Sequence, residues 1–307
     1  MGKRCGLIVL TFAFALRLGA QAPGPAAAPA HLIVTLGHVY GAQAPTLTAN
    51  DLVVTEHYDP LTITSLTPLR GALELYILVD NCSTCEPGAK FTELRRFILS
   101  QPAATSVGVA YIQDGKLQIA ETPGMDRERA AKAVNAPTQS KPSDPFTALS
   151  TLIQGWKPTS ARRAVLMIST GIDPGAEAEG FRSNAAEKAI ETAERAGVSV
   201  YAIYHPAADY ATTDFSKIYA GQVLLSHVAN ETGGESYFLG FGPLPVLAPF
   251  LADLNEHLTN QYLLEFLTAR GDAPGSLQEV TVKSKLRDVD VMTPYKAVVG
   301  GVSPGHK

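Results

Sequence analysis

The residues with the clearest chemical potential in this 307-residue chain stand where a predicted buried strand ends. Cys82 and Cys85 form a Cys-x-x-Cys pair shortly after Asp80, which itself ends the hydrophobic run 75–79. Two thiols at this spacing can form a disulfide or exchange with one. Carboxylate and hydroxyl oxygens in the same loop suit a hard cation or a polar ligand instead. The loop therefore supports two different kinds of chemistry.

Oxygen-bearing side chains also recur in two further predicted loops, so that three loops carry them: 80–88, 140–147 and 169–175. In an open α/β sheet, ligands bind in the crevice outside the carboxyl ends of the strands, and these loops should converge there. The residues that they would bring together are Asp80, Thr84, Ser143, Asp144, Thr170 and Asp173.

The elements that must position these loops alternate between strand and helix. We expect strands at 73–79, 107–112, 116–121, 164–169, 198–204 and 235–239. We expect helices opening near 90 and at 126–134, 146–153, 184–196, 224–231 and 246–258. Asp114-Gly115 signals a hairpin, Asn184 is the expected N-cap of its helix and Gly197 the C-cap. This alternation predicts a doubly wound, mostly parallel α/β sheet with helices on both faces.

Segments with strand signals alone flank this α/β region at both ends. They cover 31–36, 52–56 and 61–66 before it, and 262–268, 277–285 and 289–292 after it. Each flank is too short to form a stable sheet by itself, so we expect the two to pair into one small β-sandwich. The predicted divisions are 31–71, 72–259 and 260–299, followed by a tail at 300–307.

The stretch from residue 73 to 258 resembles the von Willebrand factor A-like (VWA) domains, most closely the exported bacterial VWA-related proteins. The resemblance rests on Asp80-Asn81-Cys82-Ser83-Thr84 after the first strand, on Ser143 in the middle loop and on Ser169-Thr170-Gly171 after the fourth strand. It implies a doubly wound fold and a protein-binding or scaffolding role rather than an enzymatic one. The ligand would dock on the face that bears Asp80, Thr84, Ser143 and Thr170.

The resemblance also implies a metal-ion-dependent adhesion site, which is degenerate in this chain. Cys82 stands in place of a serine and Thr170 in place of an aspartate. Mg²⁺ requires oxygen ligands with charge from one or two carboxylates, and a thiol does not suit it. We therefore expect no cofactor, with Mg²⁺ or Mn²⁺ binding weak or absent. Should a site survive, Asp80, Thr84, Asp144 and Asp173 would form it; the alternative is that the last two are solvated loop or turn residues.

The Cys82/Cys85 pair leaves two interpretations open. In an exported protein a short-loop structural disulfide is the usual outcome. The alternative function is that of a thiol–disulfide oxidoreductase, because a Cys-x-x-Cys pair before a helix N-terminus can acquire a low thiol pKa. No second Cys or His pair has zinc-ligand spacing.

The N-terminus predicts export to the periplasm or the extracellular space. Lys3 and Arg4 precede the apolar core 7–16, and small residues follow, which is typical of a signal peptide spanning 1–22; a Pro/Ala-rich linker covers 23–30. Of the net charge of −4, three positive charges lie in the signal peptide, so the remainder carries −4 − 3 = −7. An acidic body without a basic stripe argues against nucleic acid as a partner. We expect an unknown protein ligand and no membrane insertion after signal removal.

Overall fold

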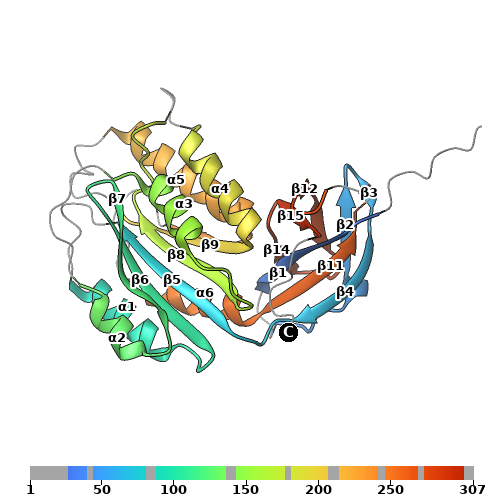
Figure 1. Ribbon diagram of the computed structural model, residues 1–307, viewed down its shortest axis with the longest axis horizontal. Helices are drawn as coiled ribbons and strands as arrows, with labels where there is room; N and C mark the ends of the chain where they lie inside the picture. Colours follow the sequence, from blue (N-terminus) through green and yellow to red (C-terminus); the bar gives the residue numbers. More distant parts are fainter. Residues whose placement is uncertain are drawn as a thin grey trace, which may run out of the picture.

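The computed structural model describes residues 27–39, 44–80, 88–135, 143–176, 181–206, 214–238, 240, 246–268 and 273–300. Two bodies lie side by side in it, an α/β domain and a smaller β-sandwich (Figure 1). The α/β domain corresponds to the middle of the sequence, and the sandwich takes strands from both ends of the chain. The predicted fold class is confirmed.

A six-stranded sheet forms the centre of the α/β domain, in the order β10-β9-β8-β5-β6-β7. Its neighbours are parallel except at β6 and β7, which form the hairpin predicted from Asp114-Gly115. Both turn residues have positive φ, 52° and 70°, as a two-residue hairpin loop requires. The strands are β5 (Leu73–Asp80), β6 (Thr105–Gln113), β7 (Lys116–Gly124), β8 (Arg162–Ser169), β9 (Val198–Tyr204) and β10 (Ser236–Tyr237).

Helices cover both faces of this sheet, which makes it doubly wound. They are α1 (Gly88–Ser100), α2 (Arg127–Ala133), α3 (Pro145–Gly155), α4 (Asn184–Ala196), α5 (Phe215–Glu231) and α6 (Ala248–Thr259). One apolar core joins the sheet to α1, α2 and α6, and a second joins it to α3, α4 and α5. Because β5, β8 and β9 are buried on both faces, they read as continuous hydrophobic runs in the sequence.

Two helix starts differ from the sequence-based expectation. Helix α4 is capped by Ser183, whose Oγ accepts a hydrogen bond from Ala186 N at 2.9 Å, so Asn184 is the first helical residue rather than the cap. Helix α5 begins at Phe215 instead of 224, because the Asp214 carboxylate caps it. A capping side chain defines the end of a helix more sharply than apolar periodicity does.

The sandwich confirms that the two flanks pair. Strand β1 (Pro29–Val39) lies between β11 (Gln261–Leu267) on one side and β14 (Val289–Met292) and β15 (Lys296–Val299) on the other. The larger sheet also contains β4 (Thr62–Pro68) and β12 (Leu277–Glu279). The smaller sheet contains β2 (Leu52–Glu56), β3 (Asp59–Pro60) and β13 (Thr281–Ser284), and a short 3₁₀ helix, η1 (Ala49–Asp51), precedes β2.

The C-terminal flank departs from the expectation in one respect. The segment 277–285, predicted as one strand, divides into β12 and β13, which belong to different sheets. Val280 lies between them, and its side chain is buried in the sandwich core. Strand β15, which follows Pro294-Tyr295, was not predicted.

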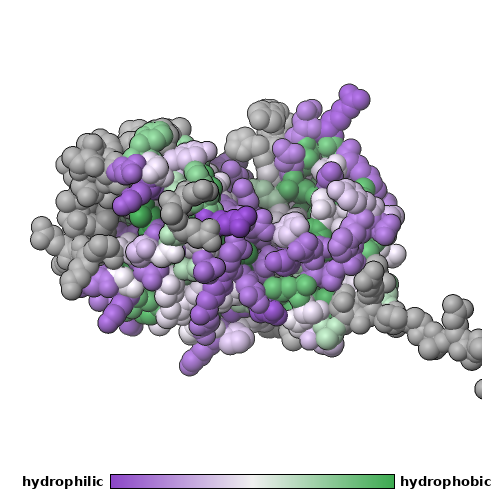
Figure 2. All heavy atoms as spheres, turned by 90° about the horizontal axis from the view of Figure 1, so that it is seen from above, coloured by the Kyte–Doolittle hydropathy of each residue, from purple (hydrophilic) through white to green (hydrophobic). Residues whose placement is uncertain are grey.

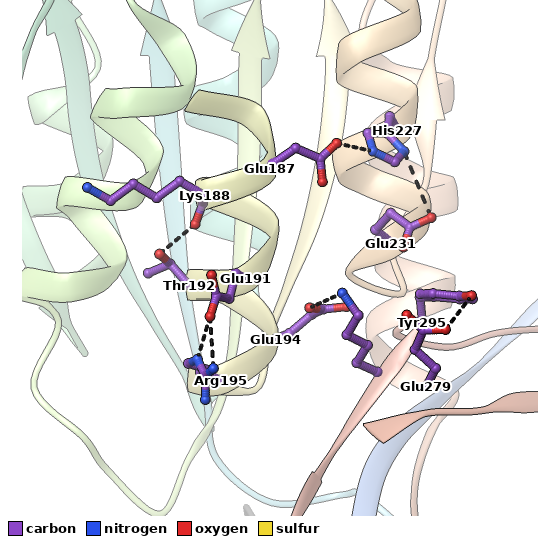
Figure 3. A network of polar contacts seen from close by, with 11 residues as sticks. Glu187, Lys188, Glu191, Thr192, Glu194, Arg195, His227, Glu231, Glu279 and Tyr295 are labelled. Carbon is purple, nitrogen blue, oxygen red and sulfur yellow. Dashed lines mark hydrogen bonds and ion pairs between the residues drawn. The ribbon is translucent and has the colours of Figure 1, made fainter. Parts of the chain in front are cut away.

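The amino ends of the parallel strands face the sandwich and their carboxyl ends point away from it (Figure 1). The carboxyl ends of α4 and α5 therefore meet the sandwich, and Figure 3 shows the polar contacts there. Arg195 donates to the Gly275 carbonyl at 3.0 Å, and the Tyr295 N–H donates to the Glu231 carbonyl at 2.9 Å. None of the helices in the described ranges has the length and apolarity of a membrane span.

Candidate functional site at the carboxyl end of the sheet

Asp80 ends β5 and points into the protein instead of out to solvent. Its side chain is 3% exposed, and Oδ2 accepts a hydrogen bond from Ser169 Oγ at 2.7 Å. Ser169 ends the neighbouring strand β8, and its Oγ also accepts from Gly171 N at 3.1 Å. Asp80 Oδ1 and Ser143 Oγ are both buried, and neither has a well-aligned hydrogen bond among the described residues, although Ser143 and the Thr170 N–H lie close enough to act on the carboxyl group. A buried carboxylate that its donors satisfy only in part is costly to ionise.

Burial is the largest influence on the pKa of the Asp80 carboxyl group. It raises the pKa of this carboxyl group to about 6, because charge is disfavoured away from water. Three neighbours oppose the effect by stabilising the carboxylate: the hydroxyls of Ser169 and Ser143 and the N–H of Thr170. The structure thus brings Asp80, Ser143 and Thr170 together at the carboxyl end, as members of one buried polar cluster.

A pair of glycines determines how the Thr170 loop runs. Gly171 has a φ of +67°, and a Cβ there would lie 2.2 Å from the carbonyl oxygen of Gly221 in α5. A Cβ on Gly221 would in turn lie 2.4 Å from the Thr170 carbonyl oxygen. The two glycines therefore let α5 pack directly against the loop. This contact buries Thr170, which is 4% exposed, and holds its N–H near Asp80.

The two other carboxylates of the loops serve local structure. Asp144 is the N-cap of α3 and accepts from Thr147 N at 3.3 Å. Asp173 accepts from Gly175 N at 2.8 Å through Oδ1 and from the Ser183 hydroxyl through Oδ2, which links it to the cap of α4. Asp173 is 9% exposed, so it is a buried turn residue and not a solvated one.

The described residues supply only part of a divalent-cation site. Asp80 is the single carboxylate of the polar cluster, and a hydroxyl donor already occupies one of its oxygens. Asp144 and Asp173 use their oxygens in caps and turns, and Thr170 supplies no charge. Nowhere in the described ranges do three His, Cys, Asp or Glu side chains gather closely enough to hold a metal ion. Mg²⁺ is usually held by one or two carboxylates together with water or phosphate.

Thr84, Cys82 and Cys85 lie in the segment 81–87, outside the described residues. The disulfide and the oxidoreductase alternative both remain predictions. A measured reduction potential separates them: a structural disulfide resists the glutathione pool, whereas a catalytic pair exchanges readily.

An aromatic patch at the same end of the sheet was not recognised from the sequence. It consists of Phe181, Phe215 and Tyr219, which are 48%, 59% and 46% exposed. Phe181 precedes α4 and the other two lie in the first turns of α5, so all three stand at helix starts beside the carboxyl end. The rings of Phe181 and Tyr219 meet edge to face, with centroids 5.7 Å apart.

Figure 2 shows hydrophobic side chains on both domains of the face seen there, whereas hydrophilic ones dominate the middle of the molecule. Phe238, after β10, and Val246, before α6, are also exposed at the carboxyl end. The available sequence signal was the presence of large apolar residues at or near helix starts, outside the core periodicity.

The strand order and the two helical layers define a doubly wound α/β domain with an accessory sandwich, which is the fold that the resemblance to VWA domains implied. Among solved structures, the chain is similar to the von Willebrand factor type A protein from Catenulispora acidiphila, with 10% identity, coverage of 93% of this chain and 74% of that one, and a TM-score of 0.43. It is similar to three N-terminal domains of the type V pili tip protein Mfa5 from Porphyromonas gingivalis, with 9% identity, coverage of 92% and 67%, and a TM-score of 0.45.

A third similar structure is the SpRpn10 VWA domain, with 15% identity, coverage of 59% of this chain and 94% of that one, and a TM-score of 0.42. No protein-family model matches the sequence, and no curated protein matches it significantly. Likeness at these identities and TM-scores assigns no function to this chain.

Proposed function

We propose that this chain is a non-enzymatic, exported protein-binding or scaffolding module whose ligand docks at the carboxyl end of the parallel sheet without a metal bridge. The observation that carries the proposal is the aromatic patch of Phe181, Phe215 and Tyr219 beside the loops over Asp80. Contiguous exposed apolar surface marks interaction sites, and aromatic residues are enriched in protein interfaces.

The polar cluster lies at the same end of the sheet, and its Thr170 loop packs against α5, which carries Phe215 and Tyr219. Asp80 and Thr170 are 3% and 4% exposed, so a ligand would touch the residues around them and not these side chains. Asp80 and Ser169 connect the ends of β5 and β8, which gives the loops a rigid base. The absence of a second free carboxylate among the described residues of the cluster supports a contact made through shape and apolar burial rather than through an ion.

The first test is a comparison of captured proteins. The chain without its predicted signal peptide is immobilised, and an extract of the source organism is passed over it in EDTA. Two matched variants accompany it: Phe181→Ser/Tyr219→Ser in the patch, and Tyr58→Ser, which removes a 97% exposed aromatic residue from the sandwich. We expect a protein that binds the wild type and Tyr58→Ser equally and is lost with the patch variant.

Equal capture by all three chains would overturn the assignment of the docking surface. Capture that requires added Mg²⁺ would overturn the metal-independent mechanism. A thermal melt of each variant before the experiment shows that it is folded.

A further inference from the structure

A cavity lies at the amino end of the parallel sheet, where the chain crosses between the two domains. It has a volume of about 320 Å³, within the range of small-molecule sites. The chain passes it twice, once between β4 and β5 and once where α6 leads into β11. Leu69, Leu73 and Leu258 form apolar walls, while Arg70 and Arg162 supply two guanidinium groups.

Arg162 is a buried cation without an acidic partner in the described part of the chain. It is 7% exposed; Nη1 donates to the Leu258 carbonyl at 2.8 Å and to Gln261 Oε1 at 2.6 Å. Its Nε is buried and has no hydrogen-bond partner among the described residues. A buried charge that is not paired is unfavourable, and an anion is what would compensate it.

Arg70 adds a second positive charge to the same cavity. Its side chain is exposed, and Nη1 donates to the Thr259 carbonyl at 2.8 Å, which connects the two chain crossings. Burial lowers the pKa of the Arg162 guanidinium, the Tyr201 phenol counteracts this, and the charge of Arg70 lowers it further. None of the residues that line the cavity is acidic.

We propose that this cavity binds a small organic carboxylate with an apolar tail. The two guanidinium groups recognise the carboxylate, for which their planar donor fork is well matched. The three leucines cover the tail. Such a ligand would bridge the two chain crossings between the domains, at a site separate from the aromatic patch.

The test compares three probes that separate charge from apolar contact: hexanoate, hexan-1-ol and inorganic phosphate. We expect hexanoate to raise the melting temperature by about 2–4 °C at ten times its dissociation constant, because it binds the folded state alone. Hexan-1-ol and phosphate should each bind at least tenfold more weakly, which isothermal titration measures directly.

Arg70→Met should weaken hexanoate binding at least tenfold without unfolding the protein, since this side chain is exposed. Arg287→Met removes an exposed arginine from the β13–β14 turn and should leave the affinity unchanged. The proposal is overturned if hexanoate does not bind, if either comparison probe binds equally well, or if Arg70→Met binds as the wild type does. These outcomes are independent of what docks on the aromatic patch.

Discussion

A buried carboxylate lies at each end of the parallel sheet, Asp80 at one and Glu194 at the other, and their surroundings differ. At the carboxyl end, Asp80 faces neutral donors from Ser169, Ser143 and Thr170, and aromatic surface lies outside. At the amino end, Glu194 in the last turn of α4 faces charged groups across the contact with the sandwich. The amino end thus joins the domains, and the carboxyl end is where we propose that a ligand docks.

Glu194 is a buried carboxylate at the junction between the two domains. Its side chain is fully buried, both carboxylate oxygens lack a hydrogen-bond partner among the described residues, and Lys296 Nζ lies 3.9 Å away (Figure 3). Burial raises the pKa of Glu194 to about 7; Lys296 opposes this, while Glu231 and Glu191 add to it. Charged side chains therefore set the pKa of the buried carboxylate at the junction, whereas hydroxyls and an N–H stabilise the carboxylate at the carboxyl end.

The largest expected effect on stability comes from a substitution in the backbone turn at the carboxyl end of the sheet. Gly171→Ala places a Cβ against the Gly221 carbonyl at a residue with positive φ, and we expect it to lower the free energy of unfolding by about 3 kcal/mol or more. Gly71→Ala is the matched control, because a Cβ there meets nothing within 4 Å. Urea unfolding measures both. A change below about 1 kcal/mol for Gly171→Ala would show that this close approach is not required.

The second effect is the pH dependence of Asp80. Folding raises the pKa of the Asp80 carboxyl group from 3.8 to about 6, so its protonated form stabilises the folded state. This stabilisation is fully present below about pH 4 and is lost as the pH rises through about 6. We expect Asp80→Asn to be more stable than the wild type at pH 8 by up to about 3 kcal/mol, with the difference vanishing near pH 4. Chemical unfolding at both pH values checks this. A variant that is less stable at pH 8 would mean that Asp80 needs its charge, as a cation ligand would.

The third effect is the pH dependence of Glu194 at the junction. As for Asp80, stability falls as the pH rises. The folded-state pKa of Glu194 is raised to about 7 from 4.5, so its stabilising contribution is complete below pH 4.5 and is lost as the pH rises through about 7. We expect Glu194→Gln to stabilise the chain at pH 8 by about 2 kcal/mol, less than the shift alone implies, because its charged neighbours are screened by water.

Unfolding curves of Glu194→Gln at pH 5 and pH 8 provide the measurement. A stability difference that is the same at both pH values would contradict the raised pKa of Glu194. Lys296→Met, which removes the opposing cation, should show the reverse change and lower stability at pH 8.

The smallest effect on stability belongs to the aromatic patch. Tyr219→Ser removes a side chain that is 46% exposed, so we expect the free energy of unfolding to change by less than about 1 kcal/mol. The same substitution should weaken ligand binding at least tenfold. If the free energy of unfolding falls by several kcal/mol instead, Tyr219 belongs to the core and the patch is not a docking surface.

Features encoded by neighbouring residues could be predicted from the sequence. The hairpin at Asp114-Gly115 follows from turn chemistry, and Gly197 does cap α4, in the left-handed region at φ 62°. The alternation of buried strands and amphipathic helices gave the doubly wound sheet. The grouping of Asp80 with Ser143 and Thr170 follows from the same topology, because parallel strands bring their carboxyl ends to one edge.

Features that depend on distant contacts could not be predicted. Nothing near Gly171 in the sequence indicates that Gly221 packs against it 50 positions later. The division of 277–285 depends on which sheet each half joins, and the cavity with Arg70 and Arg162 exists only because two chain crossings meet. The aromatic patch was missed because exposed apolar residues leave no periodic signal.

The central claim is that the carboxyl end binds a protein without a metal ion. The most direct test measures the dissociation constant of the captured partner in EDTA and again in millimolar Mg²⁺, for the wild type, Phe181→Ser/Tyr219→Ser and Tyr58→Ser. The account predicts equal affinities in the two buffers, a loss of at least tenfold for the patch variant and no change for Tyr58→Ser. Affinity that appears only with Mg²⁺, or that survives in the patch variant, would contradict it.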